Sequence, residues 1–253
     1  GQRQIYATVH ADDMFLPNVI FEATDSCVSP LFDTKYRLTA AEAQQVLTWQ
    51  QGYQATPSLQ NYRTSFPFNA YGPDPDQYPA DDLTPFLIQN RAQFYWINHT
   101  FRHVNLDGPL PLPPLTYDQV LNLELVPNHD AAINFRVAEP GPPGVATNYS
   151  KLNLITPEIS GLANVPAMQA IYDHGVRYLV SDSSRPGQGN PSPNTGYLNA
   201  LQPNVLMIPR RPSNLFFNVS LPAEWVAEFQ CVFPALGPQT FESIVERESD
   251  TLL

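Results

Sequence analysis

The stretch that decides the fold is FYWINHTFRHVNLD, residues 94–107. Its first four residues are large and apolar, which predicts a short buried strand over residues 94–97. The polar run that follows carries His99 and His103, one helical turn apart. At that spacing two imidazoles can point the same way and hold one metal ion. Such a pair also arises by chance on polar surfaces, but this one follows a buried strand, where α/β folds place their chemistry.

A second strand of this kind lies near the N-terminus. The sequence IYATVHADD, residues 5–13, predicts a strand over residues 5–10 that ends in two adjacent carboxylates, Asp12 and Asp13. Adjacent acidic residues often only cap the helix or loop that follows. Here an apolar run follows directly, so both carboxylates need solvent, a partner or a metal ion. Both are therefore candidate site residues.

Composition limits the classes of partner. The 253 residues are long enough for one large domain with a sizeable core, and we expect a single domain over residues 1–253. The net charge of −11 repels a phosphate backbone, which argues against nucleic acid as a partner. The sequence contains no run of 18 apolar residues, so we expect no membrane span.

Several features suit a secreted monomer. No charged-then-apolar leader opens the chain, so we expect any signal peptide to be removed or to lie upstream. Three Asn-x-Ser/Thr sequons would suit a glycoprotein, namely those at Asn98, Asn148 and Asn218. The two cysteines, Cys27 and Cys231, predict either one long-range disulfide or two buried thiols.

The rest of the chain alternates between predicted helices and strands, which is the pattern of an α/β fold. Helices are predicted over residues 39–49, 83–91, 117–125 and 165–173, and strands over residues 151–155, 176–180 and 205–208. The strand over residues 176–180 leads into a long polar loop that contains Asp182 and Arg185. An arginine there could fix the charge and orientation of a catalytic carboxylate, or it could simply be solvated.

The motif pair Asp12-Asp13 and His99-Thr100-x-x-His103 resembles the metal-dependent polysaccharide deacetylases of NodB homology. The wider context, including VHADDMFL and the stretch TPEISGLANVPAMQAIYDHGVRYLVSDSSRPG, is similar to the branch typified by the secreted galactosaminogalactan deacetylases of moulds. The resemblance covers most of the chain. It implies an α/β fold of the distorted (β/α) barrel type and a secreted, extracellular or cell-wall enzyme of exopolysaccharides and biofilms.

The resemblance also implies roles for single residues. Asp12 would be the general base, Asp13, His99 and His103 would bind a divalent metal, expected to be Zn²⁺, and Arg185 would orient the base. Three protein ligands leave an open position for water, as in a catalytic zinc site. The implied reaction is hydrolytic removal of acetyl groups from an amino-sugar polysaccharide, with N-acetylgalactosamine-containing galactosaminogalactan as the expected substrate.

One part of the family pattern is missing from this sequence. Family members protonate the leaving amine with a histidine from a late motif, and neither His129 nor His174 has such a setting. We expect that acid to lie beyond Leu253 in a longer polypeptide, with His10 as the internal alternative, and Trp225 is a candidate for lining the acetyl pocket. The alternative function is a catalytically silent glycan-binding module with a retained metal site.

Overall fold

The computed structural model describes residues 8–21, 35–73, 78–108, 111–139, 148–184, 195–212, 216 and 218–252. The chain divides into two compact units. Unit 1 comprises Gly1–Leu16 and Leu38–Arg210, and unit 2 comprises Pro17–Arg37 and Arg211–Leu253. Such units occur within domains as well as between them, so the expectation of a single domain stays a prediction.

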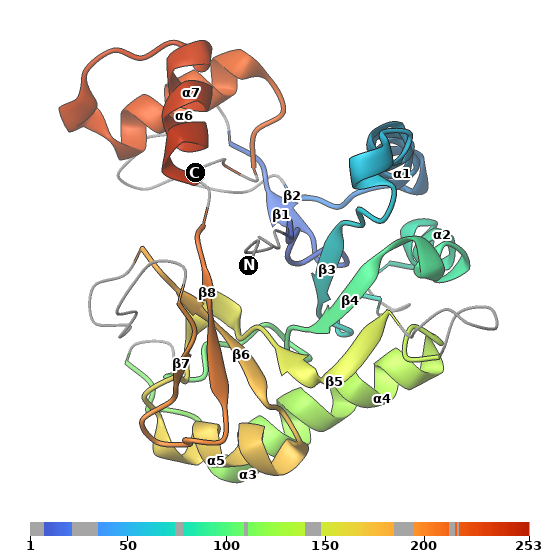
Figure 1. Ribbon diagram of the computed structural model, residues 1–253, viewed down its shortest axis with the longest axis vertical. Coiled ribbons are helices and arrows are strands. Elements are labelled where there is room, and N and C mark those ends of the chain that lie inside the picture. Colours follow the sequence, from blue (N-terminus) through green and yellow to red (C-terminus); the bar gives the residue numbers. More distant parts are fainter. Residues whose placement is uncertain are drawn as a thin grey trace. The chain divides into compact units, whose positions relative to one another are not determined.

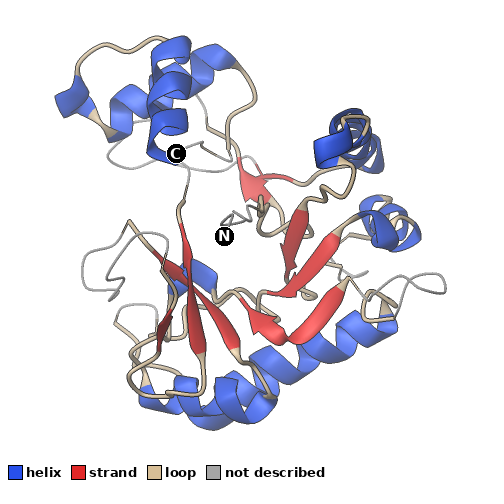
Figure 2. Ribbon diagram, viewed as in Figure 1, coloured by secondary structure: helices blue, strands red, loops and turns tan. Residues whose placement is uncertain are grey.

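Unit 1 is built on a six-stranded sheet with the strand order β3-β4-β5-β6-β8-β7 (Figure 1). The strands are β3 (Ser65–Phe68), β4 (Tyr95–Asn98), β5 (Tyr149–Leu154), β6 (Tyr178–Asp182), β7 (Tyr197–Leu198) and β8 (Leu206–Arg210). Neighbouring strands pair in parallel, except that β7 runs antiparallel to β8. A parallel bridge between His10 and Ser65 extends the pairing beyond β3. The predicted α/β class is confirmed, and the curved sheet in Figure 2 is consistent with a distorted barrel.

The helices of unit 1 pack against the sheet around two apolar clusters. They are α1 (Ala40–Gln54), α2 (Leu83–Gln89), α3 (Tyr117–Gln119), a π-helical turn (Val120–Leu125), α4 (Val126–Asn134) and α5 (Val165–His174). One cluster joins Phe66 and Trp96 of the sheet to α1 and α2, and the other joins Leu179 of β6 to α5. Burial of these faces is the main force that fixes the helices on the sheet.

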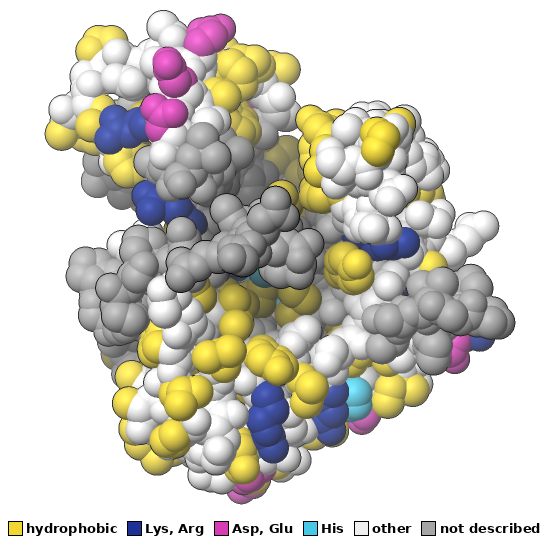
Figure 3. All heavy atoms as spheres, viewed as in Figure 1, with side chains coloured by type: hydrophobic (Ala, Val, Ile, Leu, Met, Phe, Trp, Pro, Cys, Tyr) yellow, Lys and Arg dark blue, Asp and Glu magenta, His cyan; other side chains and the backbone are white. Residues whose placement is uncertain are grey.

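Alternation along β4 shows how the sheet separates its two faces. Trp96 is buried against the helices, whereas its neighbour Tyr95 points to the opposite face and is 38% exposed. That opposite face borders a cavity of about 570 Å³, which is also lined by Ile97, Tyr178 and Ile208. Figure 3 shows hydrophobic side chains gathered over the sheet in this view.

The predicted helix ends are confirmed where the sequence carries capping residues. Thr39 caps α1 and forms a capping box with Glu42. Gly175, at φ 110°, ends α5, as glycine does at helix C-termini. The helix predicted over residues 117–125 is longer than expected, because α3 continues through the π-helical turn into α4. Pro127 does not stop it, since it lies in the first turn of α4, where its missing N–H is tolerated.

The described part of unit 2 contains a two-stranded ribbon, two α-helices and a short 3-10 helix (Pro234–Leu236). Strands β1 (Asn18–Val19) and β2 (Lys35–Tyr36) pair antiparallel, and α6 (Pro222–Val232) packs with α7 (Phe241–Leu252).

Two predictions from the sequence concern the pairing of the cysteines and the presence of membrane-spanning helices. Cys231 is disulfide-bonded, and Cys27, the other cysteine of the sequence, lies outside the described residues. Among the described residues, no helix has the length and apolar character needed to cross a membrane.

Candidate metal centre

Asp12 and Asp13 are placed by the pairing of residues 9–13 along β3. Ser65 donates its backbone N–H to Val9, and Ala11 donates to Ser65 at 3.0 Å. The Asp13 N–H continues this pattern to the Pro67 carbonyl at 3.2 Å. Asp13 itself has a positive φ of 59°, which turns the chain out of the strand direction at this point. Both carboxylates therefore stand at the carboxyl end of the parallel sheet.

His99 and His103 follow the carboxyl end of β4, in an irregular loop rather than in a helix. The chain after Asn98 bends sharply, with left-handed backbone at Thr100 (φ 63°) and at His103 (φ 56°). Residues other than glycine rarely adopt this conformation, and such strain clusters at functional sites. The helical-turn geometry suggested by the four-residue spacing is thus wrong for this loop, although the two imidazoles still converge.

The side chains of Asp13, His99 and His103 meet with distances suited to one metal ion. His99 Nε2 lies 3.4 Å from Asp13 Oδ1, and His103 Nε2 lies 3.3 Å from Asp13 Oδ2. The three potential ligand atoms all lie within 4.8 Å of one another. In a tetrahedral site with bonds of about 2.0–2.1 Å, two ligand atoms are separated by about 3.3 Å. The arrangement fits a small divalent cation without movement of the backbone.

A backbone acceptor fixes which nitrogen of His99 faces the carboxylate. His99 Nδ1 lies 2.8 Å from the carbonyl oxygen of Ile155, the residue that follows β5. A carbonyl accepts only, so Nδ1 carries the proton and Nε2 presents its lone pair toward Asp13. Histidine ligands of metal ions are commonly oriented in this way by their second nitrogen.

Burial disfavours the charged forms of the Asp13 carboxylate and the His99 imidazole. It raises the pKa of Asp13 above its ordinary value, against the opposing influence of His99 and His103. Burial also lowers the pKa of His99, which is 2% exposed. Asp13 Oδ1 is a buried oxygen without a hydrogen-bond partner among the described residues. A divalent cation would suit both groups, because it would balance the charge of the Asp13 carboxylate and accept the lone pair of the neutral His99 imidazole.

The second carboxylate is held by an arginine from the far end of the sequence. Arg210, the last residue of β8, donates from Nη1 to Asp12 Oδ2 at 2.7 Å. The other oxygen, Asp12 Oδ1, is buried and makes no hydrogen bond within the described part of the chain. The arginine expected at Asp12 was Arg185, which lies outside the described residues. The sequence run that ends β8 contains Arg210, but nothing local relates it to Asp12, 198 residues away.

His10, the internal alternative for the proton donor, lies close enough to Asp12, Arg210 and His99 to interact with them electrostatically. His10 also lines the cavity on the Tyr95 face of the sheet, and none of the three candidate ligands lines that cavity. Burial and the nearby Arg210 lower the pKa of His10 to about 4, despite the opposing charge of Asp12. The role of His10 as proton donor stays a prediction.

Three buried asparagines shape the loop that carries the histidines, and sequence reasoning missed this role. Asn98 Oδ1 accepts from the Thr100 N–H at 2.9 Å and from Asn128 Nδ2 at 2.8 Å. Asn69 donates to the carbonyls of His99 and Thr100. Asn98 is only 2% exposed, so its side chain belongs to this network and is not accessible for glycosylation at the Asn98 sequon.

An ion pair between the buried Glu124 and the exposed Arg102 also holds this loop. Glu124, in the π-helical turn, accepts from the backbone N–H of Arg102 at 2.9 Å and from Arg102 Nε at 3.0 Å. Its pKa is raised by burial, with Arg102 opposing the shift. The pairing places Arg102 outside the site and leaves His103, its neighbour, directed toward Asp13.

His129 and His174 are not part of this three-residue cluster. His129 and His174 contact each other, with ring centroids 5.6 Å apart, and His129 Nδ1 bonds the Tyr149 hydroxyl. This pair packs between α4, α5 and β5 and contributes no atom to the three-residue cluster. Trp225 belongs to α6 of unit 2, where its ring contacts Phe241.

Comparison with known proteins agrees with this architecture. The crystal structure of Agd3, described as a novel carbohydrate deacetylase, matches with a TM-score of 0.78 at 19% sequence identity. The match covers 97% of this chain and 42% of that one, so this chain spans less than half the length of that protein. No curated protein is significantly similar in sequence. The family model of the Agd3 deacetylase domain matches residues 68–253, a span that includes both histidines and Arg210. The chain therefore belongs to the Agd3 deacetylase domain family.

Proposed function

We propose that this chain is a metal-dependent de-N-acetylase that acts on an amino-sugar polysaccharide. The observation that carries the proposal is the meeting of Asp13, His99 and His103 beside a second, arginine-bound carboxylate. Amide hydrolysis needs an activated water and a group that takes its proton, and this arrangement offers both. Membership of a deacetylase family supports the same reaction.

The ligand set favours Zn²⁺ among divalent ions. One carboxylate and two imidazoles are the ligands of many catalytic zinc sites, and they leave a position for water and substrate. Bound there, the ion would supply a Lewis acid that lowers the pKa of water and polarises the acetyl carbonyl. Cobalt or nickel would suit the same donors, so availability contributes to the choice.

Asp12 is the proposed general base. Its Oδ2 is held by Arg210 at 2.7 Å, which fixes the carboxylate in one orientation. Its Oδ1 is left to accept the proton of the attacking water. Because Asp12 and Asp13 are adjacent in sequence, the base is held beside the three candidate ligands by the backbone itself. The acid expected beyond Leu253 stays a prediction.

The finer features of the function follow the resemblance noted in the sequence. Galactosaminogalactan as the substrate and secretion to the extracellular space or cell wall are proposals of this kind. A net charge of −11 suits a polymer that gains ammonium groups as acetyl groups are removed.

Metal analysis combined with acetate release tests the proposal. The wild-type chain should hold about one divalent ion and release acetate from N-acetylated galactosamine polymer, and chelation should stop the release. Asp13→Ala should lose the ion, and Asp12→Asn should keep the ion but lose at least about 100-fold in rate. Asp130→Asn, on the exposed face of α4, is the matched control and should change neither measurement.

Two results would count against the proposal. A wild-type chain without a stoichiometric ion would remove its chemical basis. A chain that binds the ion and the polymer but releases no acetate would instead support the silent glycan-binding module.

A further inference from the structure

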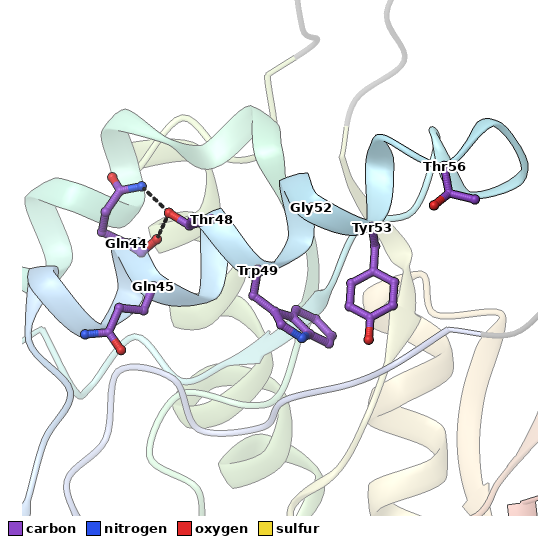
Figure 4. A pocket seen from close by; sticks show the side chains of 7 residues that line it. All are labelled: Gln44, Gln45, Thr48, Trp49, Gly52, Tyr53 and Thr56. Carbon is purple, nitrogen blue, oxygen red and sulfur yellow. Dashed lines mark hydrogen bonds between the residues drawn. The ribbon is translucent and has the colours of Figure 1, made fainter.

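A second surface with unusual chemistry lies on the outward face of α1. The inward face of this helix is buried through Ala43, Leu47 and Gln50. The opposite face borders a pocket of about 730 Å³ (Figure 4). We call the lining of this pocket the α1 surface; its residues are Gln44, Gln45, Thr48, Trp49, Gly52, Tyr53 and Thr56.

Two large aromatic rings stand exposed on the α1 surface. Trp49 is 50% exposed and Tyr53 is 46% exposed, although both side chains are large and mainly apolar. Their ring centroids are 4.8 Å apart, and Tyr62 supports both from behind at 6.1 and 6.3 Å. Mutual contact holds the rings in place, so they form a fixed platform rather than independent side chains.

The α1 surface is uncharged. No charged residue occurs between Glu42 and Arg63 in the sequence, whereas solvent-facing helix sides normally carry charged residues. A partner that relied on ion pairs would find no counter-charge here. The surface instead matches a neutral partner that has both apolar and hydrogen-bonding parts.

One amide group without a hydrogen-bond partner among the described residues lies next to the rings, whereas the neighbouring Gln44 amide donates to the Thr48 hydroxyl at 3.3 Å. Figure 4 shows Gln45, Trp49 and Tyr53 on the same side of the helix, one turn apart. The Gln45 amide makes no hydrogen bond within the described part of the chain, so it can bond to a ligand. Gly52 lies between Trp49 and Tyr53 in the sequence, and a Cβ there would meet no atom within 4 Å, so the helix surface at this residue is open.

We propose that the α1 surface is an accessory binding site for uncharged, N-acetylated segments of an amino-sugar polysaccharide. A pyranose presents a C–H face that stacks on Trp49 or Tyr53, and its hydroxyl and acetamido groups can bond to Gln45. The deacetylated product carries ammonium groups, for which this surface has no carboxylate. The identity of the ligand rests on the proposed function, and the site would hold unreacted polymer near the enzyme.

Tryptophan fluorescence and direct binding test this site apart from catalysis. The test uses the full chain carrying Asp12→Asn to prevent turnover, with an N-acetylated galactosamine oligomer and its fully deacetylated form as probes. Trp49→Ala and Tyr53→Ala each remove one ring, and Tyr53→Phe keeps the ring at residue 53 without its hydroxyl. Ile133→Ala is the remote control, because Ile133 on α4 is a comparably exposed apolar residue at 52%.

The acetylated oligomer should change the fluorescence of the chain saturably, and this change should disappear in Trp49→Phe. Trp49→Ala and Tyr53→Ala should each lose about tenfold in affinity for the acetylated oligomer. Tyr53→Phe and the control Ile133→Ala should stay within twofold of the parent. Binding should not weaken between 50 and about 500 mM salt, since no ion pair takes part. In the catalytically active chain, Trp49→Ala should slow acetate release from polymer but not from a short oligomer.

Three results would contradict the proposed binding site on the α1 surface. The first is unchanged affinity in both alanine variants, and the second is tighter binding of the deacetylated oligomer through these rings. The third is a concentration-dependent dimer that Trp49→Ala abolishes, which would identify a second copy of the chain as the occupant. If the metal-loaded wild-type chain releases no acetate while ring-dependent binding persists, the proposed function fails and the binding site on the α1 surface stands.

Discussion

At the scale of single residues, the site depends on contacts between side chains that are far apart in the sequence. Asp12 and Asp13 are adjacent, yet they face different partners. Asp13 faces two imidazoles at 3.3–3.4 Å, and Asp12 faces the guanidinium of Arg210 at 2.7 Å. This difference in surroundings is the basis for proposing Asp13 as a metal ligand and Asp12 as the base, because the residue type is the same.

Arg210 is predicted to act as a positioning residue for Asp12. Arg210→Gln removes the donor to Asp12 Oδ2, so kcat should fall by about 10–100-fold, while KM and metal content stay near those of the parent. Arg210→Lys keeps a donor and a charge and should recover part of the loss. Steady-state kinetics with metal analysis gives all three quantities.

The control for this prediction is Arg211→Gln, which changes the exposed neighbouring arginine. Equal loss in the two variants, or loss of the metal from Arg210→Gln, would show that Arg210 acts through folding rather than through Asp12.

At the scale of helices and strands, the loops after the parallel strands carry the site, and the packed strands and helices hold those loops. The histidine loop is tied to β4 by Asn98 and to the π-helical turn by Glu124. These ties stabilise the left-handed backbone at Thr100 and His103, which would otherwise cost about 1–3 kcal/mol each.

The end of α5 should make the stability of the chain depend on pH. His174 is buried, and burial together with Lys151 and His129 lowers its pKa to about 4. In the unfolded chain a histidine titrates near 6.5, so the unfolded state binds more protons between about pH 6.5 and 4. The contribution of His174 is complete above about pH 6.5 and is lost as the pH falls toward 4. Partial screening by solvent leaves a loss of roughly 1–2 kcal/mol.

Urea unfolding at pH 7 and pH 5 measures this effect. His174→Gln should show a smaller drop in the free energy of unfolding between the two pH values than the parent. His129→Gln should show a weaker change of the same sign, because burial also lowers the pKa of His129. Identical pH dependence in the parent and in His174→Gln would contradict the assignment.

At the scale of the whole molecule, one metal ion would join two separate parts of unit 1. Asp13 comes from the segment beside β3, and both histidines come from the loop after β4, 86 to 90 residues later. An ion that binds only the folded arrangement stabilises it by mass action.

Metal removal should therefore lower the thermal stability of the chain. At a free ion concentration of about 100 times Kd, binding adds about 2.7 kcal/mol, which corresponds to a rise in Tm of roughly 5–10 °C for a chain of this size. Calorimetry with and without Zn²⁺ measures the shift, and Asp13→Ala should abolish it. A zinc-dependent shift that persists in Asp13→Ala would place the ion elsewhere in the chain.

Much of the fold could be predicted from local sequence. The helix caps at Thr39 and Gly175 follow from residue type and spacing, which depend on nearby residues only. The strand predicted over residues 94–97 is found over residues 95–98, and it is only partly buried. The α/β class followed from the alternation of such elements. The length of the helix beyond residue 125 did not, because a π-helical turn accommodates a proline that sequence rules treat as a break.

The sequence by itself determined which residues could bind a metal, because Asp12-Asp13 and His99-x-x-x-His103 are local patterns of the right chemical type. Only the tertiary structure decided that Asp13 meets both imidazoles, that these imidazoles stand in a bent loop, and that Arg210 holds Asp12. The physical reason is strand register. Which loops meet at the end of a parallel sheet depends on how each strand pairs with its neighbours, and no short stretch of sequence encodes that pairing.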